Sequence, residues 1–256
     1  MLDLITPLVL TGNEEPNIAR TLGQLRWAHE VIVVDSFSDD RTVEIARSFP
    51  NVRLLQRRFE GPADQWTYGL SEVATPWLLA LDADYFVPDE MIRELDALAP
   101  PDGTNAYKAG FIYAVRGRPL RASLYPPRAV LLRRGWCFFD QDGHTQRERI
   151  EGAIGELRSR IVHDDRKSLS SFLHRQARYM EREAEKLATA APGTLPFSGR
   201  IRRLRVIAPP LVFFYTLFVK RCILDGSPGW QYVFERTTAE MILSIALIER
   251  DLRIRS

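Results

Sequence analysis

The chain has 256 residues, of which 45% are hydrophobic, 27% charged and 10% aromatic. This length accommodates one large α/β domain with a substantial core, or such a domain with a small extension. A formal net charge of +2 is too small to indicate a protein that binds nucleic acid. The two cysteines, Cys137 and Cys222, lie far apart and lack metal-ligand spacing, which favours a reducing cytoplasm over a disulfide framework.

Short apolar runs alternate with amphipathic segments in the first hundred residues. We expect strands at 8–11, 31–35, 52–55 and 77–81, and helices at 14–25, 42–49, 63–73 and 88–98. The run from Val31 to Asp35 is almost wholly apolar, as in a central parallel strand that is covered on both faces. Asn13 is expected to cap the first helix. The alternation predicts a doubly wound parallel sheet.

The pattern changes after Gly103. Further strands are expected at 106–115, 129–133 and 157–162, followed by a long amphipathic helix at 168–187 and a final helix at 237–252. Pro209-Pro210 predicts that any helix in that region begins there. We therefore predict a domain over residues 1–189 and a basic, amphipathic helical extension over residues 190–256.

Polar residues follow three of the expected strands. Asn13 and Glu14 follow the first, Asp35 ends the second, and Asp82 and Asp84 follow the fourth. Ligands of doubly wound sheets bind beyond the carboxyl ends of the strands, so these side chains are expected to share one site.

The two aspartates of Asp82-Ala83-Asp84 point to the same side of an extended strand end. Mg²⁺ typically takes one or two carboxylates together with phosphate oxygens and water. The tripeptide therefore indicates a site for a metal and a diphosphate. The alternative is a pair of solvated aspartates in a turn.

The remaining polar candidates have two interpretations each. Asp35 is suited to accept hydrogen bonds from a base or ribose, or to cap a helix. His144 and His163 are either ligands or structural hydrogen-bonding residues. Asp140 and Asp142 are either candidates for a general base or loop residues that form Asx-turns.

A basic block marks the C-terminal part of the chain. No acidic residue occurs between Glu185 and Asp225, and four arginines precede the apolar run 206–219; they are Arg200, Arg202, Arg203 and Arg205. The block suits a segment in a membrane interface with its arginines on lipid phosphates. The alternative is a buried helix with a basic beginning. The run itself is shorter than the roughly 20 residues that span a bilayer.

These residues together resemble family 2 glycosyltransferases of the GT-A fold, and most closely the bacterial lipopolysaccharide core biosynthesis glycosyltransferases. The likeness extends over nearly the whole chain. It is carried by Thr11-Gly12-Asn13-Glu14-Glu15, the segment 31–36, Gln65, Gly69-Leu70, and the segment 77–84.

The resemblance implies a GT-A-like mixed α/β sheet and an inverting, metal-dependent transfer of sugar from a nucleotide-diphosphate donor to a lipid-linked or cell-envelope glycan. Asp84 and His163 would hold a divalent metal, Mn²⁺ or Mg²⁺, and Asp142 or else Asp140 would be the base. The residues expected to contact the nucleotide-sugar are Thr11, Asn13, Glu14, Asp35, Gln65, Asp82 and His144. The protein is expected to be cytoplasmic, peripheral on the inner face of the cytoplasmic membrane, with no nucleic acid partner.

The sequence departs from this family's pattern at three positions. Tyr85 replaces the usual glutamate after the second aspartate, Trp66 replaces a basic residue, and Thr145 stands where the branch often has glutamate after histidine. Two other functions therefore stay open. One is a nucleotide-sugar- or glycan-binding module that has lost its base. The other is a nucleotidyltransferase, although the segment 11–15 is acidic where that class has a glycine-rich basic loop.

Overall fold

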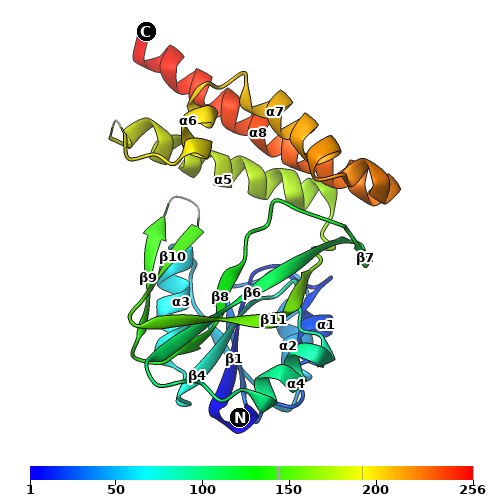
Figure 1. The fold of residues 1–256 in the computed structure, drawn as a ribbon, viewed down its shortest axis with the longest axis vertical. Coiled ribbons are helices and arrows are strands. Elements are labelled where there is room, and N and C mark those ends of the chain that lie inside the picture. Colours follow the sequence, from blue (N-terminus) through cyan, green and yellow to red (C-terminus); the bar gives the residue numbers. More distant parts are fainter. Residues whose placement is uncertain (143–144, 192, 256) are drawn as a thin grey trace. The chain divides into compact units, whose positions relative to one another are not determined.

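The computed structural model describes residues 1–142, 145–191 and 193–255 (Figure 1). The chain forms two compact units. The first comprises residues Met1–Gly117 and Tyr125–Arg166, and the second comprises Arg118–Leu124 and the chain from Lys167 onward. The long helix that the sequence analysis assigned to the first domain thus belongs to the second unit, so the observed division differs from the expected boundary at residue 189.

The first unit contains a mixed sheet. Its neighbouring strands follow the order β3-β2-β1-β4-β8-β6-β11-β5. The strands are β1 (Ile5–Thr11), β2 (Val31–Asp35), β3 (Val52–Gln56), β4 (Trp77–Asp82), β5 (Tyr85–Phe86), β6 (Thr104–Val115), β8 (Arg128–Arg133) and β11 (Ala153–His163). The first four strands in this order are parallel, as the apolar runs predicted. β8 is antiparallel to both of its neighbours, and this makes the sheet mixed.

Both faces of this sheet are covered (Figure 1). One core includes side chains from α1 (Ile18–Gly23), α2 (Thr42–Arg47) and α4 (Asp89–Ala97). The other includes side chains from α3 (Pro62–Ser71) and from a hairpin of β9 (Cys137–Asp142) and β10 (Thr145–Ile150). A short 3-10 turn, η1 (Leu2–Leu4), precedes the first strand. The doubly wound arrangement is confirmed.

Two local predictions were wrong. The first helix begins at Ile18 rather than at residue 14, because Asn13 has a left-handed backbone (φ 54°) and uses its side chain on the neighbouring loop. No strand was expected around Asp140 and Asp142, yet residues 137–142 and 145–150 form the β9–β10 hairpin. Alternate residues Cys137 and Phe139 are buried against α3, which gives the segment the period of a strand.

Glu94 joins α4 to the edge of the sheet. Its carboxylate accepts hydrogen bonds from the backbone N–H groups of Arg158 (2.7 Å) and Ser159 (2.8 Å). Burial raises the pKa of Glu94, but these bonds outweigh it and hold the pKa below the ordinary 4.5. The carboxylate therefore stabilises the fold above about pH 4.5, and this stabilisation is lost as the pH falls through the lower, folded-state pKa.

We expect Glu94→Gln to lower the free energy of unfolding by about 1 kcal/mol at pH 7, allowing for its partial exposure. The deficit is expected to shrink at pH 3, because the stabilisation from the wild-type carboxylate is lost as the pH falls through its lowered pKa. Urea titrations at both pH values measure this. The matched control is Glu90→Gln on the same helix, where the carboxylate lies in an exposed pair with Arg93. An equal loss in both variants would contradict the assignment.

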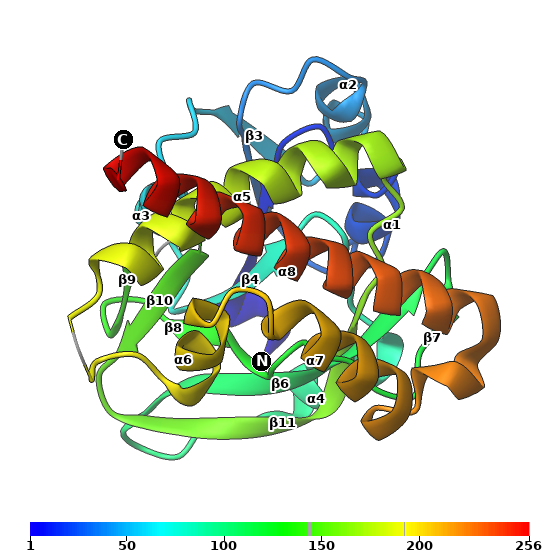
Figure 2. The same cartoon turned by 90° about the horizontal axis from the view of Figure 1, so that it is seen from above.

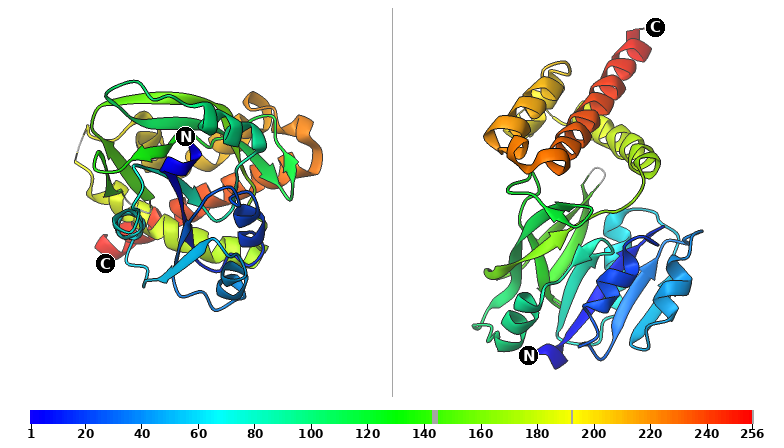
Figure 3. Two further views of the ribbon diagram at one scale, coloured as in Figure 1. Left: turned by 90° about the horizontal axis from the view of Figure 1, so that it is seen from below. Right: turned by 90° about the vertical axis from the view of Figure 1, so that its right-hand side faces the viewer.

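The second unit is a helical assembly built around α8 (Gly226–Arg255). Its other elements are β7 (Arg118–Pro119), α5 (Leu169–Thr189), α6 (Phe197–Arg203), α7 (Ala208–Phe214), a π-helical turn η2 (Tyr215–Val219) and a 3-10 turn η3 (Cys222–Asp225). α8 packs between α5 and α7 (Figures 2 and 3). Pro209 and Pro210 stand in the first turn of α7, as predicted.

Among the described residues, no helix is both long and apolar enough to cross a bilayer.

The inserted segment Arg118–Leu124 is tied to this helical unit. The backbone N–H and the guanidinium of Arg121 donate to Asp225, each at 3.2 Å, and the N–H of Leu124 donates to the hydroxyl of Tyr232 at 2.7 Å. The chain therefore leaves the sheet unit after β6 and returns to it before β8.

Three of the four arginines expected at a membrane hold this unit together instead. Arg202 makes a bidentate pair with buried Glu240 and lies 3.6 Å from Glu183. Arg203 donates to the carbonyl oxygens of residues 187 and 190 at the end of α5. Arg205 pairs with Asp251. Of the four, only Arg200 is exposed, so the arginines do not face outward as a set.

Arg202→Met is expected to destabilise the protein by about 3 kcal/mol, because it removes the guanidinium that pairs with Glu240 and lies beside Glu183, two carboxylates that are less than a tenth exposed. Arg200→Met removes the same charge at an exposed position and is expected to cost less than about 0.5 kcal/mol. Urea unfolding of both variants checks this. A direct role of Arg202 in lipid binding, without a structural role, predicts equal stabilities.

Candidate functional site

The polar strand ends meet at one edge of the sheet, as predicted. In the parallel register, Thr11 lies beside Asp35, and Asp35 lies beside Gln56. On the other side of β1, Leu10 lies beside Asp82. The residues that follow β1, β2 and β4 therefore border one site.

The loops after β1 and β2 are held to each other by hydrogen bonds. The backbone N–H of Asn13 donates to Ser38 Oγ at 2.8 Å, and the N–H of Asp39 donates to Asn13 Oδ1 at 2.9 Å. The N–H of Glu14 donates to Thr42 Oγ1 at 2.8 Å. These bonds fix the rim of the site.

Two predicted nucleotide contacts have well-defined protein partners within this rim. Buried Asp35 accepts hydrogen bonds from the backbone N–H and hydroxyl of Ser38 and from Gln56 Nε2. The side-chain oxygen of Glu14 accepts a hydrogen bond from Asn17 at 2.8 Å. The carboxylates of Asp35 and Glu14 therefore stabilise the conformations of these loops.

Gln65 and Thr11 present buried polar atoms to the same region. Gln65 Nε2 donates to Ser36 Oγ at 3.0 Å and to the carbonyl oxygen of Arg57 at 3.2 Å. Within the described parts of the chain, Gln65 Oε1 and Thr11 Oγ1 are buried without a hydrogen-bond partner. Because buried polar atoms are normally paired, these two are suited to a bound polar ligand.

Asp84 and His163 lie in contact although 79 residues separate them in the sequence. His163 Nε2 is 3.1 Å from Asp84 Oδ2, and both side chains are mostly buried. β11 ends at His163 and pairs with β5, which starts immediately after Asp84, so the sheet itself brings the two together. The rings of Tyr85, Tyr113 and Tyr125 surround the imidazole at 4.6–5.3 Å between centroids.

Charges are concentrated at this point. Burial, and then the charge of Asp84, raises the pKa of Asp82, while Arg128 and a hydrogen bond from Tyr85 oppose the rise. Burial lowers the pKa of His163, but the charge and hydrogen bond of Asp84 outweigh it, and the pKa is raised. A cluster that holds two neighbouring carboxylates against their repulsion is typical of a functional site.

The donor atoms of Asp84 and His163 fit a divalent cation that also has phosphate and water ligands. A carboxylate oxygen and an imidazole nitrogen are both accepted by Mn²⁺, and Mg²⁺ typically keeps several waters and needs only one or two carboxylates. Across the residues that the structure describes, no group of three or more His, Cys, Asp or Glu side chains forms a complete metal site. A metal here would therefore depend on a ligand such as a diphosphate to complete its coordination.

Tyr85, which occupies the position of the family's glutamate, is buried beneath this cluster. Its hydroxyl shares a hydrogen bond with that of Tyr125, and its ring packs on Phe111 at 5.0 Å between centroids. Together with its hydrogen bond to Asp82, these contacts make Tyr85 a positioning residue for the aspartate and the histidine.

A small pocket opens beside Asp82 and contains an acidic residue that the sequence analysis missed. Its lining brings together the sheet, α3 and the hairpin, and comprises Trp66, Ala80, Asp82, Tyr85, Arg128, Ala129, Val130, Phe139, Gln146 and Glu148. Glu148 pairs directly with Phe139 across the hairpin, so it shares the inward face of that residue. The sequence of residues 145–150 has no clear apolar alternation that would have predicted this placement.

Arg128 provides the positive charge in this pocket. Burial lowers the pKa of Arg128, but Tyr125, Tyr85, Asp82 and Glu148 outweigh it and hold the pKa above its ordinary value. The guanidinium is thus firmly charged and is placed beside both carboxylates, where it suits the oxygens of a diphosphate.

Of the two base candidates expected from the sequence, Asp140 lies outside this pocket. Asp140 is more than half exposed and lies 3.6 Å from Arg149, on the face of the hairpin opposite Phe139. Asp142 ends β9, and the direction of its side chain is not described. The predicted nucleotide contact His144 lies outside the described residues.

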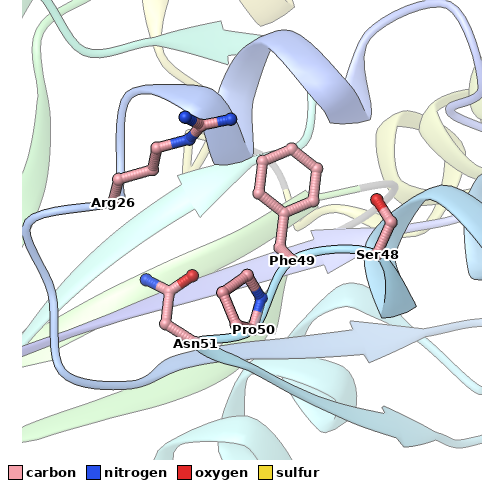
Figure 4. A pocket seen from close by; sticks show the side chains of 5 residues that line it. All are labelled: Arg26, Ser48, Phe49, Pro50 and Asn51. Atoms are coloured by element: carbon pink, nitrogen blue, oxygen red, sulfur yellow. The ribbon is translucent and has the colours of Figure 1, made fainter.

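A second pocket lies at the opposite ends of the parallel strands (Figure 4). It is lined by Arg26, Ser48, Phe49, Pro50 and Asn51, which precede β2 and β3. Asn51 Nδ2 donates to the carbonyl oxygens of residues 25 and 28 at 3.0 Å, so its side chain holds two loops together. This pocket shares no residue with the site at the carboxyl ends of the strands.

Comparisons with known proteins agree with this geometry. Residues 8–127 match the model of Glycosyl transferase family 2. The chain is 25% identical over 244 residues to the lipopolysaccharide core biosynthesis glycosyltransferase LpsC of Rhizobium meliloti, covering 87% of this chain and 84% of the relative.

Two solved structures resemble the fold. The mannosyltransferase PcManGT from Pyrobaculum calidifontis, in complex with GDP-Man and Mn²⁺, has a TM-score of 0.55 and 16% identity and covers 95% of this chain and 86% of its own. S. aureus TarS in complex with UDP-GlcNAc has a TM-score of 0.52 and 16% identity and covers 98% of this chain and 92% of its own. The mixed α/β sheet with GT-A neighbours confirms the expected fold class.

Proposed function

The chain is a glycosyltransferase with a family 2 domain over residues 8–127, and from this premise we propose that it is inverting and metal-dependent and uses a nucleotide-diphosphate sugar. The observation that carries the proposal is the meeting of Asp82, Asp84 and His163 at the carboxyl edge of the sheet. The structurally similar proteins bound to GDP-Man with Mn²⁺ and to UDP-GlcNAc support the class of donor.

We assign the donor end of the reaction to the strand ends. The loops after β1 and β2 would hold the nucleoside, with the backbone around Asn13 and Asp35 already fixed by hydrogen bonds. Asp84 and His163 would hold a divalent cation, which supplies charge neutralisation for the departing diphosphate. Arg128 would donate to the diphosphate oxygens and stabilise the charge that develops there.

We assign the proton transfer to Glu148. The acceptor hydroxyl would give its proton to this carboxylate while its oxygen forms a bond to the anomeric carbon. The bond from that carbon to the diphosphate breaks, and the diphosphate leaves with the electron pair. The position of Glu148 in the pocket with Asp82 supports this role, because a general base must reach the reacting hydroxyl.

The acceptor we propose is a lipid-linked or cell-envelope glycan, used at the inner face of the cytoplasmic membrane. Support comes from the similarity to a lipopolysaccharide core biosynthesis glycosyltransferase along 87% of the chain.

A thermal-shift screen tests the donor class. The purified protein is mixed with UDP-, GDP-, TDP- and CMP-sugars, each with and without Mn²⁺, and the melting temperature is measured. A ligand of the folded state raises the melting temperature by mass action. We expect one nucleoside-diphosphate sugar to do so, and more strongly with Mn²⁺. If only the CMP-sugar stabilises the protein, or if Mn²⁺ makes no difference, the proposal is wrong.

A further inference from the structure

α8 is apolar on two opposite faces. The face packed inside the second unit includes Tyr232, Val233, Leu243 and Leu247, which are at most 5% exposed. A second set of apolar side chains, each 38–63% exposed, has a spacing of seven, four, three and four residues; it comprises Phe234, Met241, Ile245, Ile248 and Leu252. At about 100° per residue this spacing forms one stripe, on the side of the helix away from its packed face.

A similar stripe runs along α7 and η2. Its members are 46–57% exposed and comprise Ile207, Leu211, Phe214 and Phe218. A chain of ring contacts connects the two stripes, with distances given between ring centroids. Phe214 stacks on Phe218 at 6.2 Å and lies 5.3 Å from Phe213. Phe213 lies 6.4 Å from Trp230, which lies 5.5 Å from Phe234 on α8. Because α7 also packs along α8, the stripes form one surface, which we name the apolar face.

Positive charge borders the apolar face at the α7 end. Lys220 places its Nζ 5.8 Å from the ring centre of half-exposed Tyr215, and exposed Arg221 follows it. The sequence has no acidic residue between Glu185 and Asp225, and Asp225 itself is paired with Arg121. Along α8, the exposed Glu249 lies 3.9 Å from Arg253.

We propose that the apolar face lies in the interfacial layer of an anionic lipid bilayer, with α7 and α8 parallel to the membrane surface. An exposed apolar surface of this extent indicates an interaction site rather than ordinary solvent-facing residues. Aromatic rings with lysine and arginine at their edge suit the boundary between acyl chains and anionic headgroups.

A second copy of this chain would be a weaker match. The stripe on α8 has the three- and four-residue spacing of a coiled-coil seam, but the adjoining stripe of α7 makes the surface wider than one seam. The α7 end would also place Lys220 and Arg221 against a surface of the same composition. An anionic headgroup layer complements them instead.

Vesicle flotation of the full chain tests the proposal. We expect the wild-type protein to float with vesicles of phosphatidylcholine and phosphatidylglycerol and to float less with phosphatidylcholine alone. The triple variant Leu211→Ser/Phe214→Ser/Phe218→Ser is expected to reduce the bound fraction at least about tenfold, because each change removes a side chain that would be buried. Met241→Gln/Ile245→Gln/Ile248→Gln is expected to act in the same direction.

The matched control places the same kind of change on the sheet unit. Leu4→Gln/Trp136→Gln/Ile154→Gln replaces three apolar side chains that are 41–49% exposed, and it should float as the wild type does. Lys220→Gln/Arg221→Asn should reduce binding to the anionic vesicles about tenfold and leave binding to neutral vesicles unchanged. Asparagine is used at 221 because this residue has a left-handed backbone (φ 58°).

Two outcomes would overturn the proposal. One is a wild-type protein that does not float with anionic vesicles at low salt. The other is a wild-type dimer by light scattering that becomes monomeric in the α8 triple variant while flotation is unchanged.

The proposal goes beyond the assigned transfer reaction. Stabilisation by a nucleotide-sugar in solution is expected to be the same in all of these variants, so the failure of one proposal is distinguishable from that of the other.

Discussion

Asp84→Asn is expected to lower the rate of sugar release from the nucleotide-sugar with Mn²⁺ by about a thousandfold or more. The variant keeps the size of the side chain but removes the charge that would hold the metal against the diphosphate. Metal stabilisation of a leaving group contributes several kcal/mol, and 1.4 kcal/mol corresponds to tenfold in rate. The measurement is hydrolysis of the donor that the thermal-shift screen identifies, followed across a Mn²⁺ titration.

The same substitution is expected to leave the fold nearly as stable as before. Asp84→Asn loses the charged contact with His163, but it also removes the repulsion that adds to burial in raising the pKa of Asp82. A melting temperature within a few degrees of the wild type, together with lost turnover, is the pattern of a residue placed for function at a cost in stability.

Asp102→Asn is the matched control for this experiment. Asp102 lies in the exposed turn before β6 and should retain full Mn²⁺-dependent activity. If Asp84→Asn hydrolysed the donor at the wild-type rate with the same dependence on Mn²⁺, the assignment of the metal site would be wrong.

The donor half of the site was predictable because its signals are local. A buried parallel strand is a continuous apolar run, and the residue that ends it is polar, as at Asp35 and Asp82. The alternation of strand and helix then places these strand ends at one edge of the sheet. The partner of Asp84 required more. His163 was assigned through the family resemblance, and its contact depends on the pairing of β11 with β5.

The hairpin was not predictable in the same way. Its inward face combines buried Cys137 and Phe139 on β9 with Gln146 and Glu148 on β10. Polar residues therefore occupy inward as well as outward positions, and the sequence shows no clear apolar alternation. Asp142 and His144 were chosen as candidates because their residue types suit catalysis. Residue type alone does not reveal which face of a strand a side chain occupies.

The basic block shows the same limit at longer range. Arg202 and Arg205 find their partners 38 and 46 residues further along, in α8. A run of arginines before an apolar segment has the composition of a membrane anchor, and also that of a helix bound to acidic positions on a distant helix. Only the packing of α6 on α8 distinguishes the two. Apolar side chains of α7 and α8 are exposed, whereas Arg202 and Arg205 are held in ion pairs within the unit.

The second large effect is expected at Glu148. Glu148→Gln keeps the shape and hydrogen-bonding reach of the side chain but cannot accept a proton from the acceptor. General base catalysis typically contributes about 10²–10⁴-fold, so we expect kcat for transfer to fall within that range. Affinity for the nucleotide-sugar, measured by calorimetry, should change little, because the donor contacts assigned to the strand ends remain.

Asp140→Asn on the outer face of the same hairpin is the control that makes this test decisive. Both variants replace a carboxylate by its amide on adjoining strands, but only Glu148 lines the pocket with Asp82. A base at Glu148 predicts a large loss for Glu148→Gln and nearly full activity for Asp140→Asn.

If Asp140→Asn lost transfer while Glu148→Gln retained it, the base would lie on the outer face of the hairpin. This is one of the two alternatives that the sequence suggested. If Asp142→Asn alone were inactive, the residue at the end of β9 would carry the proton transfer. Each result assigns the proton to a different residue, and only the first agrees with the position of Glu148 beside Asp82.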